Sequence, residues 1–139
     1  MADTPHAAHR PRPLSPHVFH YGWSVTMATS ITHRFTGGGL AVGTVLLAWW
    51  LFAVANGFIP YNQFISLAAT PLGQVILFGI TWSLSYHLLN GIRHLVWDMG
   101  YGYSIGVARA TSILVIIGSI VLAAGLFALA YAGYGGFYK

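Results

Sequence analysis

Histidine is the residue type in this chain with the clearest chemical potential, because neutral imidazole binds metals and moves protons near neutral pH. The stretch SLSYHLLNGIRHLVWD, residues 83–98, spaces its polar residues so that they share one helix face. The residues on this face are Ser83, His87, Asn90, Gly91, His94 and Asp98. At about 1.5 Å of rise per residue, His87 lies roughly 16 Å from Asp98, which is near the bilayer centre if Asp98 marks the interface.

His87 has two interpretations. It can simply hydrogen-bond to a neighbouring helix, or it can bind a ligand. Ionisable groups inside a membrane are rare and usually functional, which favours the ligand role. Neutral imidazole is a good ligand of haem iron, so a haem is one group that His87 could bind. Gly91, one turn further on, would leave room for a flat macrocycle, although glycine equally permits close helix packing.

A second axial ligand for the same iron is not obvious in this chain. His94 shares a face with His87 but lies about 10.5 Å away along the axis. His33 is expected at the edge of the first helix, level with His94 rather than with His87. A six-coordinate haem would therefore need a histidine from another subunit.

A second polar cluster, SITHRFTGGG at residues 30–39, lies where the first apolar segment begins. Haem propionates favour Arg and protonated His near the water interface, which makes His33, Arg34 and His94 candidate partners. Ser30 lies one turn before Arg34, and together they could hold a quinone carbonyl and stabilise charge on its reduced oxygen. Alternatively, Arg34 snorkels to anionic headgroups and Ser30 bonds to its own backbone.

The composition is that of an integral membrane protein. The chain has 139 residues, enough for one domain, and is 56% hydrophobic and 6% charged, against about 25% charged in soluble domains. Its net charge of +4 comes from scattered Lys and Arg without a basic run, so no nucleic-acid binding is expected. Cysteine is absent, so this chain alone cannot hold a disulfide, a thiolate metal site or an iron–sulfur cluster.

Three apolar segments predict an all-α integral membrane protein with three transmembrane helices, at about 26–58, 72–97 and 108–132. Residues 1–25 are expected to form a proline-rich tail, and residues 26–139 a three-helix membrane domain. The stretch IPYNQFISLAATP between the first two segments is expected to be a loop, because proline and asparagine are breakers.

Basic residues predict the orientation. Arg10 and Arg12 lie in the N-terminal tail, Arg93 and Arg109 flank the second loop, and the C-terminus has only Lys139. The positive-inside rule therefore places the N-terminus and the second loop on the cytoplasmic or matrix side. The start of the first helix and the end of the second then meet at the same membrane face.

Two segments carry a family resemblance. RPLSPHVFHYGWSVTMATSITHRFTG (12–37) and HLLNGIRHLVWDMG (87–100) resemble the signature segments of the large cytochrome b membrane-anchor subunit of succinate dehydrogenase, respiratory complex II. Together they cover about 40 of 139 residues. The spaced histidine, glycine, arginine, histidine and aspartate of the second segment make it specific, whereas His20 departs from the aliphatic residue usual there. The resemblance implies that His87 is one axial ligand of haem b and that the small membrane-anchor subunit supplies the other.

The resemblance also implies roles for the remaining polar residues. Ser30 and Arg34 would line a ubiquinone pocket, and His33, Arg34 and His94 would lie at or near the haem propionates. Asp98 would lie near the pocket mouth, on a possible proton path. None of these residues would be catalytic toward succinate, so the chain would be a subunit of the enzyme rather than an enzyme alone.

The resemblance places the succinate chemistry in other chains. A flavoprotein subunit with FAD and an iron–sulfur subunit with its clusters would oxidise succinate and pass electrons to ubiquinone at the membrane face. The tail at residues 1–25 would face these soluble subunits, and residues 26–139 would be the membrane anchor domain. The expected location is the inner membrane of a bacterium, in preference to the mitochondrial inner membrane. Three alternatives remain open: a quinol:fumarate reductase anchor, a small transporter subunit with a proton relay, and a structural anchor whose histidines only join helices.

Overall fold

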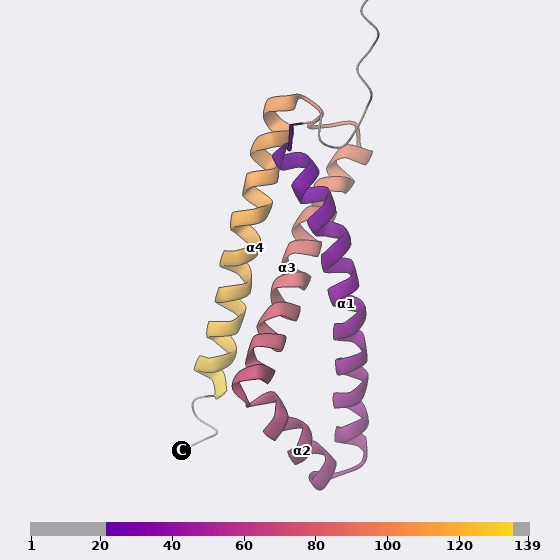
Figure 1. The fold of residues 1–139 in the computed structure, drawn as a ribbon, viewed down its shortest axis with the longest axis vertical. Helices are drawn as coiled ribbons and strands as arrows, with labels where there is room; N and C mark the ends of the chain where they lie inside the picture. Colours follow the sequence, from indigo (N-terminus) through magenta and orange to yellow (C-terminus); the bar gives the residue numbers. More distant parts are fainter. Residues whose placement is uncertain (1–21, 135–139) are drawn as a thin grey trace, which may run out of the picture.

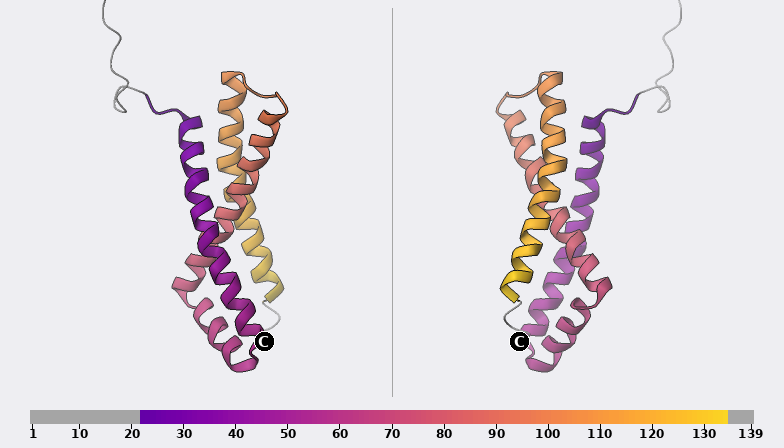
Figure 2. Two further views of the ribbon diagram at one scale, coloured as in Figure 1. Left: turned by 90° about the vertical axis from the view of Figure 1, so that its right-hand side faces the viewer. Right: turned by 90° about the vertical axis from the view of Figure 1, so that its left-hand side faces the viewer.

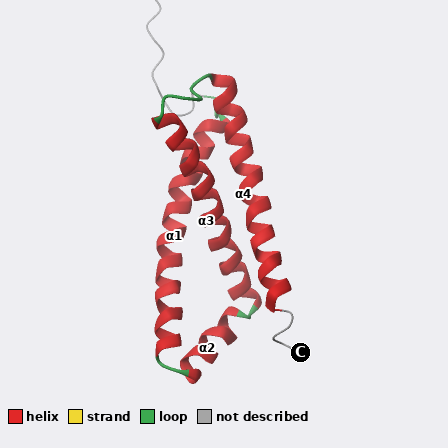
Figure 3. Ribbon diagram, turned by 180° about the vertical axis from the view of Figure 1, so that it is seen from behind, coloured by secondary structure: helices red, strands yellow, loops and turns green. Residues whose placement is uncertain are grey.

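The computed structural model describes residues 22–134, which form helices joined by short loops (Figures 1 and 3). The helices are α1 (Val25–Ala55), α2 (Phe58–Ala68), α3 (Pro71–Asp98) and α4 (Ile105–Tyr134). Most of the predicted tail, together with Arg10, Arg12, His20 and Lys139, lies outside the described residues. The membrane orientation therefore stays a prediction.

Three of these helices can cross a membrane, which confirms the predicted all-α membrane fold. The segments Val25–Ala55, Pro71–Asp98 and Ile105–Gly133 are long and apolar enough to span. A helix of 28 residues is about 42 Å long, longer than a hydrocarbon core of about 30 Å, so its ends reach the headgroup region.

The helix ends follow from local sequence signals. Ser24 caps α1 by accepting a hydrogen bond of 3.2 Å from the backbone N–H of Met27. Thr70 caps α3 in the same way, with 3.1 Å to the N–H of Gly73, and Pro71 follows at a position where no backbone N–H is needed. After α1 the chain turns at Gly57, whose φ of +98° favours glycine.

The short helix α2 replaces the loop that the sequence predicts between the first two membrane segments. Helix α1 ends at Ala55, and not at residue 58 as predicted, because α2 already begins at Phe58. The predicted loop was wrong because Pro60, expected to prevent a helix, is the third residue of α2. In the first turn of a helix the backbone N–H has no intrahelical partner, so proline is tolerated there.

The packing places small side chains inside and large apolar ones outside. Thr29, Ser112, Ser119 and Ala123 are fully buried, whereas most large aliphatic and aromatic side chains face outward. In a bilayer the lipid solvates such side chains, and small residues let helix backbones approach closely. The interior therefore relies on close contact and short hydrogen bonds, such as the 3.0 Å bond that the Tyr86 hydroxyl donates to the carbonyl of Thr29.

Helix α3 packs against both α1 and α4, and α1 and α4 also contact each other (Figures 1 and 2). The start of α1 and the loop between α3 and α4 lie at one end of the molecule, and α2 closes the other end (Figure 1). This arrangement brings the polar cluster at residues 30–39 of α1 beside the second half of α3, as the sequence predicts.

Candidate functional site

His87 of α3 meets Thr36 of α1 at the centre of the candidate site. The Nδ1 atom of His87 lies 3.4 Å from the hydroxyl of Thr36. The same hydroxyl donates a hydrogen bond of 3.0 Å to the backbone carbonyl of His33. Thr36 is 2% exposed, so this contact is part of the α1–α3 interface and not a surface encounter.

His33 lies close to both His87 and His94, whereas the sequence predicted that it would be level with His94 and not with His87. Its ring stacks on that of His87 with 3.9 Å between centroids and 13° between planes, and lies 5.4 Å from the ring of His94. The predicted depth was wrong because the expected helix start, near residue 26, fixes only the place of His33 along α1, eight residues or about 12 Å from Val25. Its level relative to α3 depends on how the two helices cross. His33 lies more than two turns inside the helix and bridges the levels of the other two histidines.

The stacked pair does not supply two axial ligands to one metal ion. Metal–imidazole bonds are about 2 Å long, so opposed axial histidines point their nitrogen edges at each other across about 4 Å. His33 and His87 instead lie face to face. The correction in depth therefore leaves unchanged the prediction that a six-coordinate haem would take its second axial ligand from another subunit.

Glycines on α1 allow the close approach of the two helices. A Cβ at Gly37 would lie 3.4 Å from Cε1 of His87, and one at Gly39 would lie 2.9 Å from Oγ of Ser83. One at Gly43 would lie 3.0 Å from Cγ2 of Ile80. Two of the three glycines in SITHRFTGGG thus serve helix packing, while a Cβ at Gly38 would meet nothing within 4 Å.

Space remains beside α3 one turn beyond His87. A Cβ at Gly91 would meet no described atom within 4 Å outside its own helical turn. The neighbouring Leu88 and Ile92 are both exposed. Gly91 therefore does not serve packing within this chain, and its side of α3 is free for another group.

Ser30 and Arg34 lie one turn apart on α1 and are both exposed. Residues 30, 33, 34 and 37 follow the three- and four-residue spacing of a helix face, so this pair flanks His33. Asp98 is the last residue of α3 and is also exposed. The structure thus brings Ser30, Arg34 and the histidines to one half of the molecule, with Asp98 at the nearby end.

The predicted polar stripe of α3 divides between two neighbours. Ser83 and His87 contact α1, whereas Asn90 pairs with Arg93, whose Nη1 donates to Asn90 Oδ1 at 3.2 Å. Arg93 also donates to Thr111 Oγ1 at 3.1 Å and to the carbonyl of Ala108 at 3.2 Å, both on α4.

Arg93 is a structural residue that the sequence reasoning treated only as a marker of orientation. It is 6% exposed, and its guanidinium carbon lies 4.0 Å from the ring centroid of Trp97. The signal that could have identified it is its position five residues inside the end of α3, with Asn90 one turn before it.

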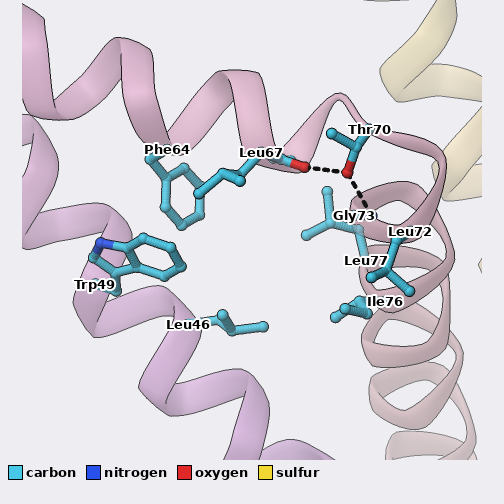
Figure 4. A pocket seen from close by; sticks show the side chains of 10 residues that line it. Leu46, Trp49, Phe64, Leu67, Thr70, Leu72, Gly73, Ile76 and Leu77 are labelled. Carbon is cyan, nitrogen blue, oxygen red and sulfur yellow. Dashed lines mark hydrogen bonds between the residues drawn. The ribbon is translucent and has the colours of Figure 1, made fainter.

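An apolar cavity lies away from these residues, at the end of the molecule that α2 closes. Its volume is about 230 Å³, and its lining comes from α1, α2, α3 and the loop before α3 (Figure 4). Trp49, Phe64 and Leu77 are among the lining residues, and none of the lining side chains is ionisable. The cavity therefore lacks the imidazole and guanidinium groups that could ligate iron or bind a carboxylate.

The fold and the site together define a polytopic membrane subunit with an imidazole cluster between two of its helices. A family model for the succinate dehydrogenase/fumarate reductase transmembrane subunit matches residues 8–126. The chain is also 44% identical to a succinate dehydrogenase cytochrome b556 subunit of Paracoccus denitrificans, over 81% of this chain and 86% of the relative. The chain therefore belongs to the succinate dehydrogenase/fumarate reductase transmembrane subunit family.

More distant relatives extend the comparison to two further lineages. A succinate dehydrogenase cytochrome b556 subunit of Rickettsia conorii is 35% identical over 88% of this chain and 95% of the relative. A mitochondrial succinate dehydrogenase cytochrome b560 subunit of Bos taurus is 39% identical over 85% of this chain and 71% of the relative. The resemblance read from the two signature segments is confirmed.

Proposed function

We propose that this chain is the large membrane anchor of a succinate:ubiquinone oxidoreductase, where it helps to hold a haem b and forms part of the ubiquinone-reduction site. The observation that carries the proposal is the convergence of His87, His33 and His94 beside the exposed pair Ser30 and Arg34. The names of the relatives, which are cytochrome b subunits of succinate dehydrogenase, support the same function.

The residues around His87 fit a haem. The Nδ1 edge of His87 contacts Thr36, which leaves Nε2 as the atom that can bind iron. The space beside Gly91 can take the edge of a macrocycle against α3. His33 Nδ1 is buried and has no hydrogen-bond partner among the described residues. A buried polar atom without a partner is costly, and a propionate oxygen would satisfy it.

The haem, when bound, would supply a reversible one-electron couple within the membrane. This chain would contribute His87 as one axial ligand, and the small anchor subunit would contribute the other. His33, Arg34 and His94 would lie at or near the propionates, where charge-assisted hydrogen bonds to carboxylates are strong.

Ser30 and Arg34 would bind ubiquinone. Both side chains are exposed on α1, so their donors face whatever packs against that surface of the chain. A guanidinium and a hydroxyl that donate to one carbonyl would stabilise negative charge as electrons arrive on the quinone. Asp98, exposed at the end of α3, would supply protons from the aqueous side.

The electrons would come from other chains. Without cysteine, this chain has no thiolate with which to hold an iron–sulfur cluster. A flavoprotein subunit with FAD and an iron–sulfur subunit would oxidise succinate and deliver electrons at the end of the molecule where α1 begins. The proposed location is the inner membrane of a bacterium, with that end on the cytoplasmic side.

A quinol:fumarate reductase anchor is the second candidate, because the matching family model covers both enzymes. The same site can serve either direction, since the potentials of cofactors in the partner chains decide the direction.

The proposal is tested by a difference spectrum of the complex purified through a tag on this chain. Succinate should reduce a b-type haem in the wild type, and His87→Leu at equal expression should weaken or shift that signal. A colourless complex without succinate–quinone activity would overturn the proposal in favour of a transporter subunit or a bare anchor. A colourless but active complex would keep the quinone site and remove the haem. Haem reduced by a quinol but not by succinate would favour the fumarate reductase.

A further inference from the structure

The hydroxyl of Thr36 makes two contacts, and they constrain its single proton. One contact reaches the carbonyl of His33 at 3.0 Å, and the other reaches Nδ1 of His87 at 3.4 Å. A backbone carbonyl oxygen only accepts hydrogen bonds, so the hydroxyl must be the donor in the first contact. Its single proton is then used in the bond to the carbonyl, so the hydroxyl can only accept a hydrogen bond from His87.

The second contact therefore selects one form of His87. With the hydroxyl as acceptor, His87 must donate through Nδ1–H, because two acceptors facing each other would repel. A neutral imidazole protonated at Nδ1 carries its free lone pair on Nε2. Nε2 lies on the ring edge away from Thr36, so this tautomer directs the lone pair away from α1.

We propose that Thr36 is a positioning residue that fixes the Nδ1–H tautomer and ring orientation of His87, and so prepares Nε2 to bind haem iron. This inference rests on the proposed haem role of His87. The stacked ring of His33 covers one face of His87 and leaves its edges free, so Thr36 and iron can engage opposite edges at once. A hydrogen bond to the distant imidazole nitrogen also raises the basicity of the ligating one.

The hydrogen bond from the Thr36 hydroxyl to the backbone carbonyl of His33 holds the hydroxyl in place. Thr36 is on α1, one turn after His33, and its hydroxyl is anchored to the helix from which it projects. Thr36 is also buried to 2% exposure, so its hydroxyl is shielded from water. A bond at 3.4 Å is long, and ligation of Nε2 makes Nδ1–H a stronger donor, which would tighten it.

The test compares three variants of this chain in the purified complex. Thr36→Val keeps the shape of the side chain and removes the acceptor. Thr36→Ser keeps the hydroxyl. Thr44→Val is the matched control on the same helix, because within residues 22–134 the Thr44 hydroxyl bonds only to the carbonyl of Leu40, at 2.9 Å. The measurements are the midpoint potential of the haem, the low-field g value of the ferric haem and the rate of haem transfer to apomyoglobin.

Thr36→Val should raise the midpoint potential, since a less basic ligand stabilises ferric iron less, and should shift the g value. It should also speed haem transfer by about tenfold, the lower end of what loss of such a partner costs. Thr36→Ser and Thr44→Val should match the wild type. An unchanged potential and g value in Thr36→Val, or equal changes in Thr36→Ser, would overturn the inference.

A parallel His87→Leu variant separates this inference from the proposed function. If His87→Leu leaves the haem spectrum and the transfer rate unchanged, His87 is not the ligand, so the haem role proposed for His87 and the role of Thr36 both fail, whereas the proposed quinone site is unaffected. If His87→Leu disturbs the haem while Thr36→Val does not, the ligand assignment stands and only the role of Thr36 is refuted.

Discussion

The ring of His33 stacks face to face on the ring of His87, with 3.9 Å between ring centroids. Thr36 holds the edge of the same imidazole, so two residues one turn apart on α1 fix one ring of α3 in both its plane and its rotation. In its proposed role as a haem ligand, His87 would need no reordering of its ring on binding, which would lower the entropic cost of binding.

The stacking contact predicts a difference between two substitutions of His33. His33→Phe keeps a flat ring against His87, whereas His33→Ala removes it and leaves a gap beside the ring. We expect His33→Ala to lose more haem per complex than His33→Phe, measured as pyridine haemochrome. Because both variants lack the ring nitrogens, a deficit that they share reports the propionate contact. Haem contents equal to that of the wild type in both variants would contradict any role of His33.

Ser30→Ala and Arg34→Gln should impair quinone reduction and spare the earlier electron transfers. We expect succinate–ubiquinone activity to fall by tenfold or more, as happens when a donor to developing negative charge is lost. Succinate-driven reduction of phenazine methosulfate, which accepts electrons before the quinone site, should be unchanged. A parallel fall in both activities would show damage to assembly and would refute the site assignment.

Gly91→Leu should lower the haem content without disturbing the fold of the chain. A Cβ at Gly91 would meet no described atom within 4 Å outside its own helical turn, so the chain should accumulate and pack normally. It would, however, occupy the space assigned to the macrocycle, and haem content should fall strongly. Gly79→Leu on the same helix, which also meets nothing within 4 Å, is the control and should keep its haem. Full haem content in Gly91→Leu would place the haem elsewhere.

Gly39→Val should weaken the α1–α3 interface. A Cβ there would lie 2.9 Å from Ser83 Oγ, and the two methyl groups of valine exceed what rotation of a serine can relieve. Overpacking of this kind costs about 1–3 kcal/mol. Gly38→Val, one position earlier with open space around it, is the control. The check is the SDS concentration at half-unfolding, which should fall for Gly39→Val only.

Arg93→Met should loosen α4 from α3. The substitution keeps an apolar stem and removes the donors to Thr111 and Ala108, and hydrogen bonds to charged groups contribute about 1.5–3 kcal/mol. We expect earlier unfolding in SDS and faster proteolysis of the loop between α3 and α4. Arg109→Met, at an exposed position, should behave like the wild type. Equal stability of both variants would show that lipid replaces the Arg93 contacts.

Much of the fold could be predicted because long apolar runs have few alternatives in a bilayer. The spans near residues 26, 72 and 108 were found from such runs, although α4 begins earlier, at Ile105. The helix at Phe58–Ala68 could not be predicted from breakers alone, since the effect of Pro60 depends on where the first turn falls.

The site could be predicted only in part, for a similar reason. His87 stood out because an ionisable group in a membrane helix is rare, whereas Thr36 looks like any other helix threonine. Its role depends on how α1 crosses α3, and that crossing depends on glycine contacts such as Gly39 with Ser83. The same crossing angle put His33 beside His87, which counting residues from an assumed helix start could not show.

The Arg93 contacts have a consequence for biosynthesis. Helices enter the membrane in the order in which they leave the ribosome, so α3 arrives before α4 has been made. Until then, Arg93 keeps its contacts with Asn90 and Trp97 of its own helix but lacks the carbonyl of Ala108 and the hydroxyl of Thr111 as acceptors. The hydrogen bonds of Arg93 are therefore complete only after the last helix has been made and has packed against α3.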